Sequence, residues 1–155
     1  MSALLLVLTA GVIGFNVISF SRLSSTIERL SKQAFLFEEF LAKEPGKLQF
    51  RESKHEVLLH GHCHQKAFAA VTPILDVLRL IPGAKPELIE SSCCGMAGAF
   101  GYGAETHAAS MAMGELSLLP AVRAASLDTR IAADGFSCRH QIRDGSGRQA
   151  DHVAV

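Results

Sequence analysis

The sequence has no excess of charge of either sign, because 15 Lys and Arg residues balance 15 Asp and Glu residues over 155 positions. Proteins that bind nucleic acid or anionic lipid usually carry a basic surface. The balanced charge therefore argues against both classes at the level of the whole chain, and we expect no nucleic-acid partner. With 48% hydrophobic residues, the chain has enough apolar material for one compact domain with a sizeable core.

Cysteine is also scarce, and the four cysteines are Cys63, Cys93, Cys94 and Cys138. Their spacing is unlike the even framework of a secreted disulfide-rich protein. The adjacent Cys93 and Cys94 cannot easily bridge to each other, because the resulting ring is strained. We therefore expect reduced cysteines in a cytoplasmic protein, acting as ligands of a metal or cluster.

Phosphate-binding motifs are missing as well. The glycine-rich run at positions 95–103 lacks the GxxxxGK[ST] pattern, and its glycine spacing behind two cysteines is unlike a dinucleotide fingerprint. The run is better explained by the cysteines that precede it.

The chain begins with an apolar stretch. Residues 3–20 carry no formal charge, and as a helix these eighteen residues would span about 27 Å, just enough for a hydrocarbon core. No Lys or Arg precedes the stretch, and Gly11, Gly14 and Asn16 dilute it. We favour a buried apolar element over a membrane anchor, with the truncation of a longer chain as another origin of this segment, and place the boundary after residue 22. If the stretch did meet a membrane, the basic residues after it would leave residues 23–155 on the cytoplasmic side.

Residues 25–43 have the pattern of an amphipathic helix. Ser25 and Glu28 form a capping-box sequence, and apolar residues then recur at helical spacing up to Leu41. The sequence predicts a helix that ends near Lys43, before Pro45.

From residue 56 one theme occurs three times, a short apolar strand that leads into a turn with candidate ligand residues. The strands are predicted at 57–59, 87–90 and 129–133. The first two turns continue into helices, one bent by Pro73 and stopped at Pro82, and one starting near Glu105 and interrupted at Pro120. Strands that alternate with helices predict an α/β fold, a small parallel sheet with flanking helices and a helical N-terminal extension.

In a parallel sheet the turns after the strands emerge along the same edge, where ligands bind. The fold would therefore bring the cysteine-bearing loops together at the C-terminal edge of the strands. Four cysteines suit either an iron–sulfur cluster or structural zinc, and the residues alone leave both open. Gly95 and Gly98 favour a cluster, because backbone N–H groups can approach sulfides where no side chain stands.

Other residues of these turns are candidates for supporting roles. Lys66 and the helix N-termini would offset negative charge. His62, His64 and His140 are candidate ligands or hydrogen-bond donors to the ligands, and for each we expect a non-ligand role. The rival hypotheses are a catalytic thiolate at Cys63, between two histidines, and a redox-active thiol pair. We favour metal or cluster binding because every thiol is expected at one edge.

Four separated motifs then carry a family resemblance. They are HGHCHQKA at 60–67, ESSCCGMAGAFGY at 90–102, MGELSLLPAVRAA at 113–125 and ADGFSCRHQIRDGSGRQADH at 133–152. From about Ala34 to the end, the chain resembles the C-terminal cysteine-rich CCG module of FAD-linked iron–sulfur oxidoreductases. This group includes D-lactate, glycolate and other 2-hydroxyacid dehydrogenases, and the module is related to a cysteine-rich component of heterodisulfide reductase.

The resemblance implies an electron-transfer module with an iron–sulfur cluster, of 4Fe-4S type, in which Cys63, Cys93, Cys94 and Cys138 match the family's ligand cysteines. Gln141 stands where the fullest form of the motif has a further cysteine, which leaves zinc as an alternative. The sequence shows neither a flavin-binding region nor a CxxCxxC run. We therefore expect FAD only on a partner or missing domain.

The expected partner is a flavoprotein or iron–sulfur subunit or domain, and the isolated chain is not expected to be a complete catalyst. We expect a cytoplasmic location, or one at the cytoplasmic face of a membrane if residues 3–20 make contact there. The alternative function is a zinc-binding or metal-free docking module without redox activity.

Overall fold

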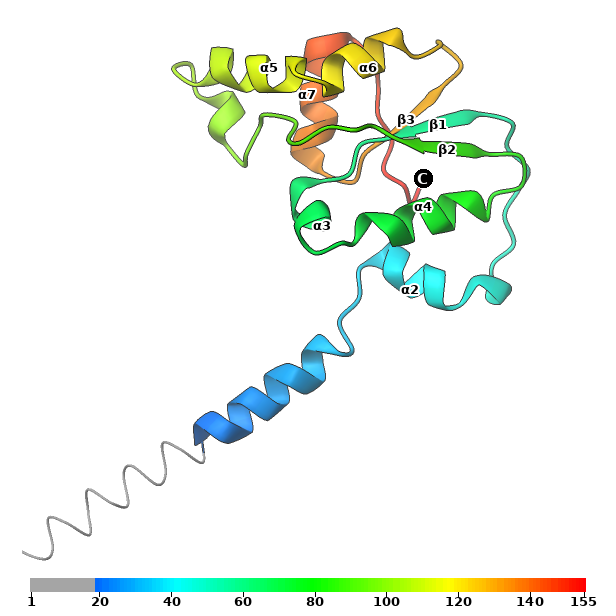
Figure 1. The fold of residues 1–155 in the computed structure, drawn as a ribbon, viewed down its shortest axis with the longest axis vertical. Helices are drawn as coiled ribbons and strands as arrows, with labels where there is room; N and C mark the ends of the chain where they lie inside the picture. Colours follow the sequence, from blue (N-terminus) through cyan, green and yellow to red (C-terminus); the bar gives the residue numbers. More distant parts are fainter. Residues whose placement is uncertain (1–18) are drawn as a thin grey trace, which may run out of the picture. The chain divides into compact units, whose positions relative to one another are not determined.

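The computed structural model describes residues 19–155 (Figure 1). The chain divides into a unit that ends at Leu36 and a second unit, Phe37–Val155. The apolar segment predicted at residues 3–20 lies, except for its last two positions, outside the described residues, and the predicted boundary after residue 22 stays a prediction. None of the helices within residues 19–155 combines the length and the apolar content needed to cross a bilayer.

The described part of the first unit contains a helix over residues 19–31. The side chains of Ser25 and Thr26 donate hydrogen bonds to the carbonyl of Arg22, at 2.9 Å each, so they lie inside the helix and do not cap it. A separate helix α2, Phe37–Lys43, begins the second unit and is followed by a short 3₁₀ turn, η1, Pro45–Lys47. The prediction of one helix from Ser25 to Lys43 is therefore wrong.

The second unit is built on a three-stranded parallel sheet. Its strands are β1, Glu56–Leu59, β2, Lys85–Leu88, and β3, Arg130–Ala132, in the order β2-β1-β3. Leu58 in the central strand is paired with Glu87 on one side and Ile131 on the other. The predicted α/β fold with a small parallel sheet is confirmed.

Two helices connect β1 to β2. These are α3, Cys63–Ala67, and α4, Val71–Arg79. The chain breaks between them at Ala69, whose φ is 55°, and not at Pro73. Pro73 is the third residue of α4, where a backbone N–H has no partner within the helix, so proline is tolerated there. The predicted bend at Pro73 is therefore wrong.

The connection from β2 to β3 contains a 3₁₀ turn, η2, Phe100–Tyr102, and two helices, α5, His107–Glu115, and α6, Leu118–Ala124. A further helix, α7, Phe136–Ser146, follows β3 and was not predicted. Cys138 therefore lies in the first turn of a helix, and Cys63 is the first residue of α3. Cys93 and Cys94 lie in a loop.

The helices cover the two faces of the sheet. Helix α4 lies against one face, while α6 and α7 lie on the other with α5 beside them (Figure 1). Val57 and Leu59 pack with Ile74 and Leu78 of α4. On the opposite face, Ile131 of β3 belongs to a core with the following members: Ile89, Cys94, Met96, Leu118, Val122, Ala133, Cys138 and Ile142. Two of the four cysteines are thus core residues.

The strand order also indicates the edge of the sheet at which a ligand is expected. The chain passes from β1 to β2 on one side and later returns to place β3 on the other side of β1. In such sheets the connections leave adjacent strands in opposite directions and open a crevice at their carboxyl ends. The turns that follow β1 and β3 leave the sheet at this edge and lead into the helices that carry Cys63 and Cys138.

Candidate metal centre

Three buried donors from distant parts of the chain meet at the carboxyl ends of the strands. They are His60, directly after β1, Cys94, in the loop after β2, and Cys138, in the first turn of α7. Their exposed fractions are 1%, 5% and 1%, and their ligand atoms all lie within 4.8 Å of one another. Sulfur and imidazole nitrogen are donors that iron, zinc and copper favour.

Cys63 and Cys93 lie at the edge of this group. Cys63 is exposed and Cys93 is half-buried. Within residues 19–155, neither is part of the compact three-donor group. Charge at both thiols nevertheless contributes to raising the pKa of Cys138, so all four thiols share one electrostatic environment.

The pKa values of the two buried thiols, Cys94 and Cys138, are shifted in opposite directions. A hydrogen bond with Cys138 lowers the pKa of Cys94 to about 4, and burial opposes this shift. Hydrogen bonds from His60 and from the backbone of Met96 lower this pKa further. The pKa of Cys138 is raised, first by the same hydrogen bond and then by burial. The lowered pKa of Cys94 favours the thiolate form, which is the form that binds metals.

His60 is the residue that sequence reasoning missed. Its Nδ1 atom lies 2.9 Å from the Ser91 hydroxyl oxygen, which fixes the orientation of the ring. The sequence offered one weak signal, that His60 directly follows the apolar run 57–59, and burial in the structure is what separates it from His62 and His64. Metal-bound histidines are usually oriented by such a second hydrogen bond.

Lys66 joins the turn after β1 to the loop that carries Cys93. Its ammonium group donates hydrogen bonds to the carbonyl oxygens of Ser91 and Ser92 and to the Ser91 hydroxyl. Burial lowers the pKa of Lys66, while the neighbouring Cys138 and Cys93 act in the opposite direction. The ammonium group of Lys66 therefore lies in the electrostatic environment of the thiols. Its role in offsetting the charge of a metal or cluster stays a prediction.

The other predicted histidines have local contacts. His62 caps α3 by accepting a hydrogen bond from the backbone N–H of His64 at 3.3 Å, and the two rings lie edge to face. Burial lowers the pKa of His62. His140 packs against Phe136, with ring centroids 4.2 Å apart, and against Tyr102. A ligand role for these histidines stays a prediction.

Gln141 is buried and faces Ser110 of α5. Its amide nitrogen donates to the Ser110 carbonyl oxygen at 3.0 Å and to the Ser110 hydroxyl at 3.1 Å. These bonds join α7 to α5 and give Gln141 a structural role beside the thiols. Its assignment as a ligand stays a prediction.

The glycines near the thiols differ in what surrounds them. Gly95 has a φ of +96° and donates its N–H to the Cys93 sulfur at 3.3 Å. Gly98 also has a positive φ, but a Cβ there would meet nothing within 4 Å. Gly135, which was not predicted, leaves no room for a side chain, since a Cβ would lie 2.5 Å from the His62 ring and 2.8 Å from the Cys138 sulfur. The turns after β1 and β3 therefore touch at Gly135.

Comparison with known proteins gives partial matches to dehydrogenases. The C subunit of anaerobic glycerol-3-phosphate dehydrogenase, in Escherichia coli strains K12 and O157:H7, is 29% identical over 97 residues, which cover 63% of this chain and 24% of that protein. D-2-hydroxyglutarate dehydrogenase of Escherichia coli K12 is 39% identical over 70 residues, which cover 45% of this chain and 7% of that enzyme. The chain is similar to parts of dehydrogenases.

The chain spans less than a quarter of the length of these relatives. No family model and no solved structure matches it. This similarity agrees with the dehydrogenase resemblance of the four motifs. It covers only part of each relative and says nothing about the rest of those proteins.

The difference in burial among the thiols predicts an order of alkylation. In metal-free protein, iodoacetamide should modify the exposed Cys63 at least about tenfold faster than the buried Cys94 and Cys138, because alkylation needs access as well as thiolate. Mass spectrometry of peptides after short labelling would measure the order. Equal rates at Cys63 and Cys138 would contradict this arrangement.

Proposed function

We propose that this chain is an electron-transfer module that binds an iron–sulfur cluster and serves as a fragment or subunit of an FAD-dependent 2-hydroxyacid oxidoreductase. The observation that carries the proposal is the convergence of Cys94 and Cys138, together with His60, at the carboxyl ends of a parallel sheet, with Cys63 and Cys93 near enough for their charge to act on Cys138. The similarity to dehydrogenase components supports it.

In this proposal Cys63, Cys93, Cys94 and Cys138 hold the cluster, which supplies one-electron transfer when bound. The low pKa of Cys94 provides one thiolate without further proton loss. Lys66 and the N-terminus of the eleven-residue α7 place positive charge near the thiolates. Burial of Cys94 and Cys138 excludes water from that side of the site. Gly95 and Gly98 are the proposed cofactor-binding glycines, and the hydrogen bond from the Gly95 N–H to the Cys93 sulfur supports this role for Gly95.

The partner in this proposal is a flavoprotein or iron–sulfur subunit or domain that carries FAD and oxidises the substrate. The isolated chain is then not a complete catalyst. We propose a cytoplasmic location, or one at the cytoplasmic face of a membrane through residues 3–20.

The geometry also favours a second candidate, a zinc-binding docking module without redox activity. His60, Cys94 and Cys138 form a compact set of one nitrogen and two sulfurs, which suits a single zinc ion with one further ligand. A cluster needs more widely spaced thiolates and would recruit Cys63 and Cys93. The two candidates therefore differ in which residues are indispensable.

Elemental analysis of protein prepared and reconstituted without oxygen tests both candidates. A cluster predicts iron and acid-labile sulfide in equal amounts and a brown colour that fades on reduction, whereas zinc predicts a colourless protein. If the chain binds a cluster, Cys63→Ser should abolish cluster binding. If it binds zinc through His60, Cys94 and Cys138, the same variant should keep its zinc. His60→Ala should lower the zinc content, because His60 is one of the three proposed zinc ligands. His107→Ala, at an exposed histidine, is the control and should leave the zinc content unchanged. Protein that retains neither iron nor zinc would overturn both proposals.

A further inference from the structure

We propose that Glu38, Asp134 and His152 form a second cation site, separate from the cysteines, which binds a divalent metal ion through two carboxylates and one imidazole. One ligand atom from each of these residues lies within 4.8 Å of the other two. Ligands at about 2.1 Å from one ion lie at most about 4.2 Å apart, so small side-chain rotations would complete the site.

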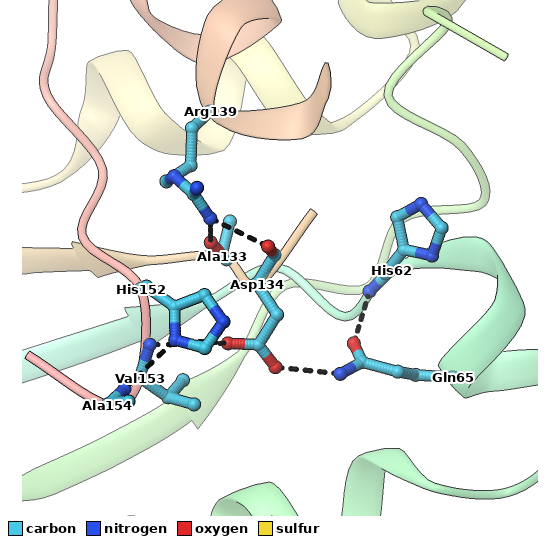
Figure 2. Close-up of polar contacts among 8 residues, drawn as sticks. All are labelled: His62, Gln65, Ala133, Asp134, Arg139, His152, Val153 and Ala154. Carbon is cyan, nitrogen blue, oxygen red and sulfur yellow. Dashed lines mark hydrogen bonds and ion pairs between the residues drawn. The ribbon is translucent and has the colours of Figure 1, made fainter. Parts of the chain in front are cut away.

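The three residues come from different parts of the second unit. Glu38 lies in the first turn of α2, Asp134 lies two residues after the end of β3, and His152 lies in the C-terminal segment. The Nδ1 atom of His152 accepts a hydrogen bond from the Ala154 N–H at 3.1 Å and lies 3.7 Å from the Asp134 carboxylate. The Val153 N–H donates to the same carboxylate at 3.2 Å (Figure 2). Metal binding would therefore use Nε2 of His152 or replace the bond to Ala154. A cation there would tie these three segments together.

Glu38 supplies the independent observation that points to a ligand. It is 4% exposed, and its Oε1 atom is buried with no hydrogen-bond partner among the described residues. A buried carboxylate oxygen without a partner is costly, because it loses its hydration and gains nothing in return. Burial raises the pKa of Glu38, a hydrogen bond from its own backbone opposes this shift, and the nearby Asp134 raises the pKa further. A cation placed between the two carboxylates would remove both penalties.

The donor set indicates the class of cation. Carboxylates suit magnesium, calcium and manganese, while imidazole suits zinc, iron and other transition metals, and this group contains no thiolate. A first-row divalent ion such as Mn²⁺ accepts both kinds of donor. The cysteine group prefers softer ions, so the two sites would select different metals.

Hydrogen bonds connect the proposed site to the turn that carries Cys63. The Gln65 amide donates to Oδ2 of Asp134 at 2.7 Å, and its oxygen accepts from the His62 N–H at 3.0 Å (Figure 2). Arg139 of α7 donates to the carbonyl oxygens of Ala133 and Asp134. An ion on Asp134 would therefore also fix the turns that flank the thiols, and its role is structural.

Titration of the full chain with Mn²⁺, followed by electron paramagnetic resonance, tests the proposal. Free Mn²⁺ gives a strong six-line signal that decreases on binding, and thiolates compete weakly for this ion. We expect one Mn²⁺ per chain, and Glu38→Gln should weaken binding by about tenfold or more. Mn²⁺ should also raise the melting temperature of the native protein but not of this variant.

Three further variants separate loss of the site from loss of folding. His152→Gln changes a side chain that is 39% exposed, so it tests the same site with little risk to folding, and it should also lose binding. Glu39→Gln removes the same charge from the adjacent position of α2 and should retain binding, as should Cys94→Ser. Absence of saturable Mn²⁺ binding, or binding unaffected by Glu38→Gln and His152→Gln, would overturn the proposal and leave a proton as the partner of Glu38.

Discussion

Cys94→Ser should lower the bound iron of anaerobically reconstituted protein by about tenfold or more, and bound zinc likewise if zinc is the native metal. Cys94 belongs to the compact three-donor group, and its low pKa makes it the thiolate of the pair at neutral pH. A serine hydroxyl has nearly the same size but is not ionised at this pH and binds soft metals poorly. Metal per chain, measured together with visible absorption, gives the result.

Ser92→Ala is a suitable control because Ser92 lies two residues earlier in the same loop and its side chain is exposed. It keeps the backbone carbonyl that accepts a hydrogen bond from Lys66. This control should bind metal as the native protein does, and circular dichroism would verify that both variants are folded. A folded Cys94→Ser protein with full metal content would remove Cys94 from the site and refute the proposed centre.

Gly95→Ala should lower the free energy of unfolding by about 3–5 kcal/mol, a large fraction of the total for a domain of this size. The backbone of Gly95 has a φ of +96°, which an L-residue rarely adopts, and a Cβ there would collide with the Ser110 carbonyl. That carbonyl also accepts a hydrogen bond from Gln141, so moving it would disturb a buried bond between α5 and α7. Urea unfolding monitored by circular dichroism measures the change.

Gly98→Ala separates the two causes. Gly98 also has a positive φ, +69°, but a Cβ there meets nothing within 4 Å, so only the backbone penalty of roughly 1–2 kcal/mol applies. Equal losses in the two variants would show that the contact between Gly95 and Ser110 contributes little. A larger loss at Gly95, accompanied by loss of metal, would show that this contact holds the cysteine loop in place.

Much of the fold could be predicted from local patterns. The short runs of apolar residues around Leu58, Leu88 and Ile131 indicated the three strands, and their alternation with helices indicated a parallel sheet. The helix boundaries were less accessible. Ser25 begins a capping-box sequence, but its hydroxyl donates to the Arg22 carbonyl and Ser25 lies inside the helix. Helix α7 was missed because most of its residues are polar, and the buried Ile142 alone gives no helical pattern. Local propensity is a weak guide where tertiary contacts decide the boundary.

The site shows the same division. Its edge of the sheet followed from the sequence, because the turns after parallel strands share one side. His60 was overlooked because, in the sequence, it is one of three similar histidines, and only burial distinguishes it from the capping residue His62. The partnership of Glu38 with Asp134 and His152 joins residues about a hundred positions apart, and no local pattern signals it.

The sequence by itself determined the parallel α/β layout, the four thiols and the resemblance to oxidoreductase modules, since these depend on short-range periodicity and on motifs. Only the tertiary structure decided which donors converge, in which direction the pKa of each buried thiol moves and which carboxylate oxygen is left without a partner. These properties depend on distance and on the exclusion of water, and both arise only when segments far apart in the chain pack against each other.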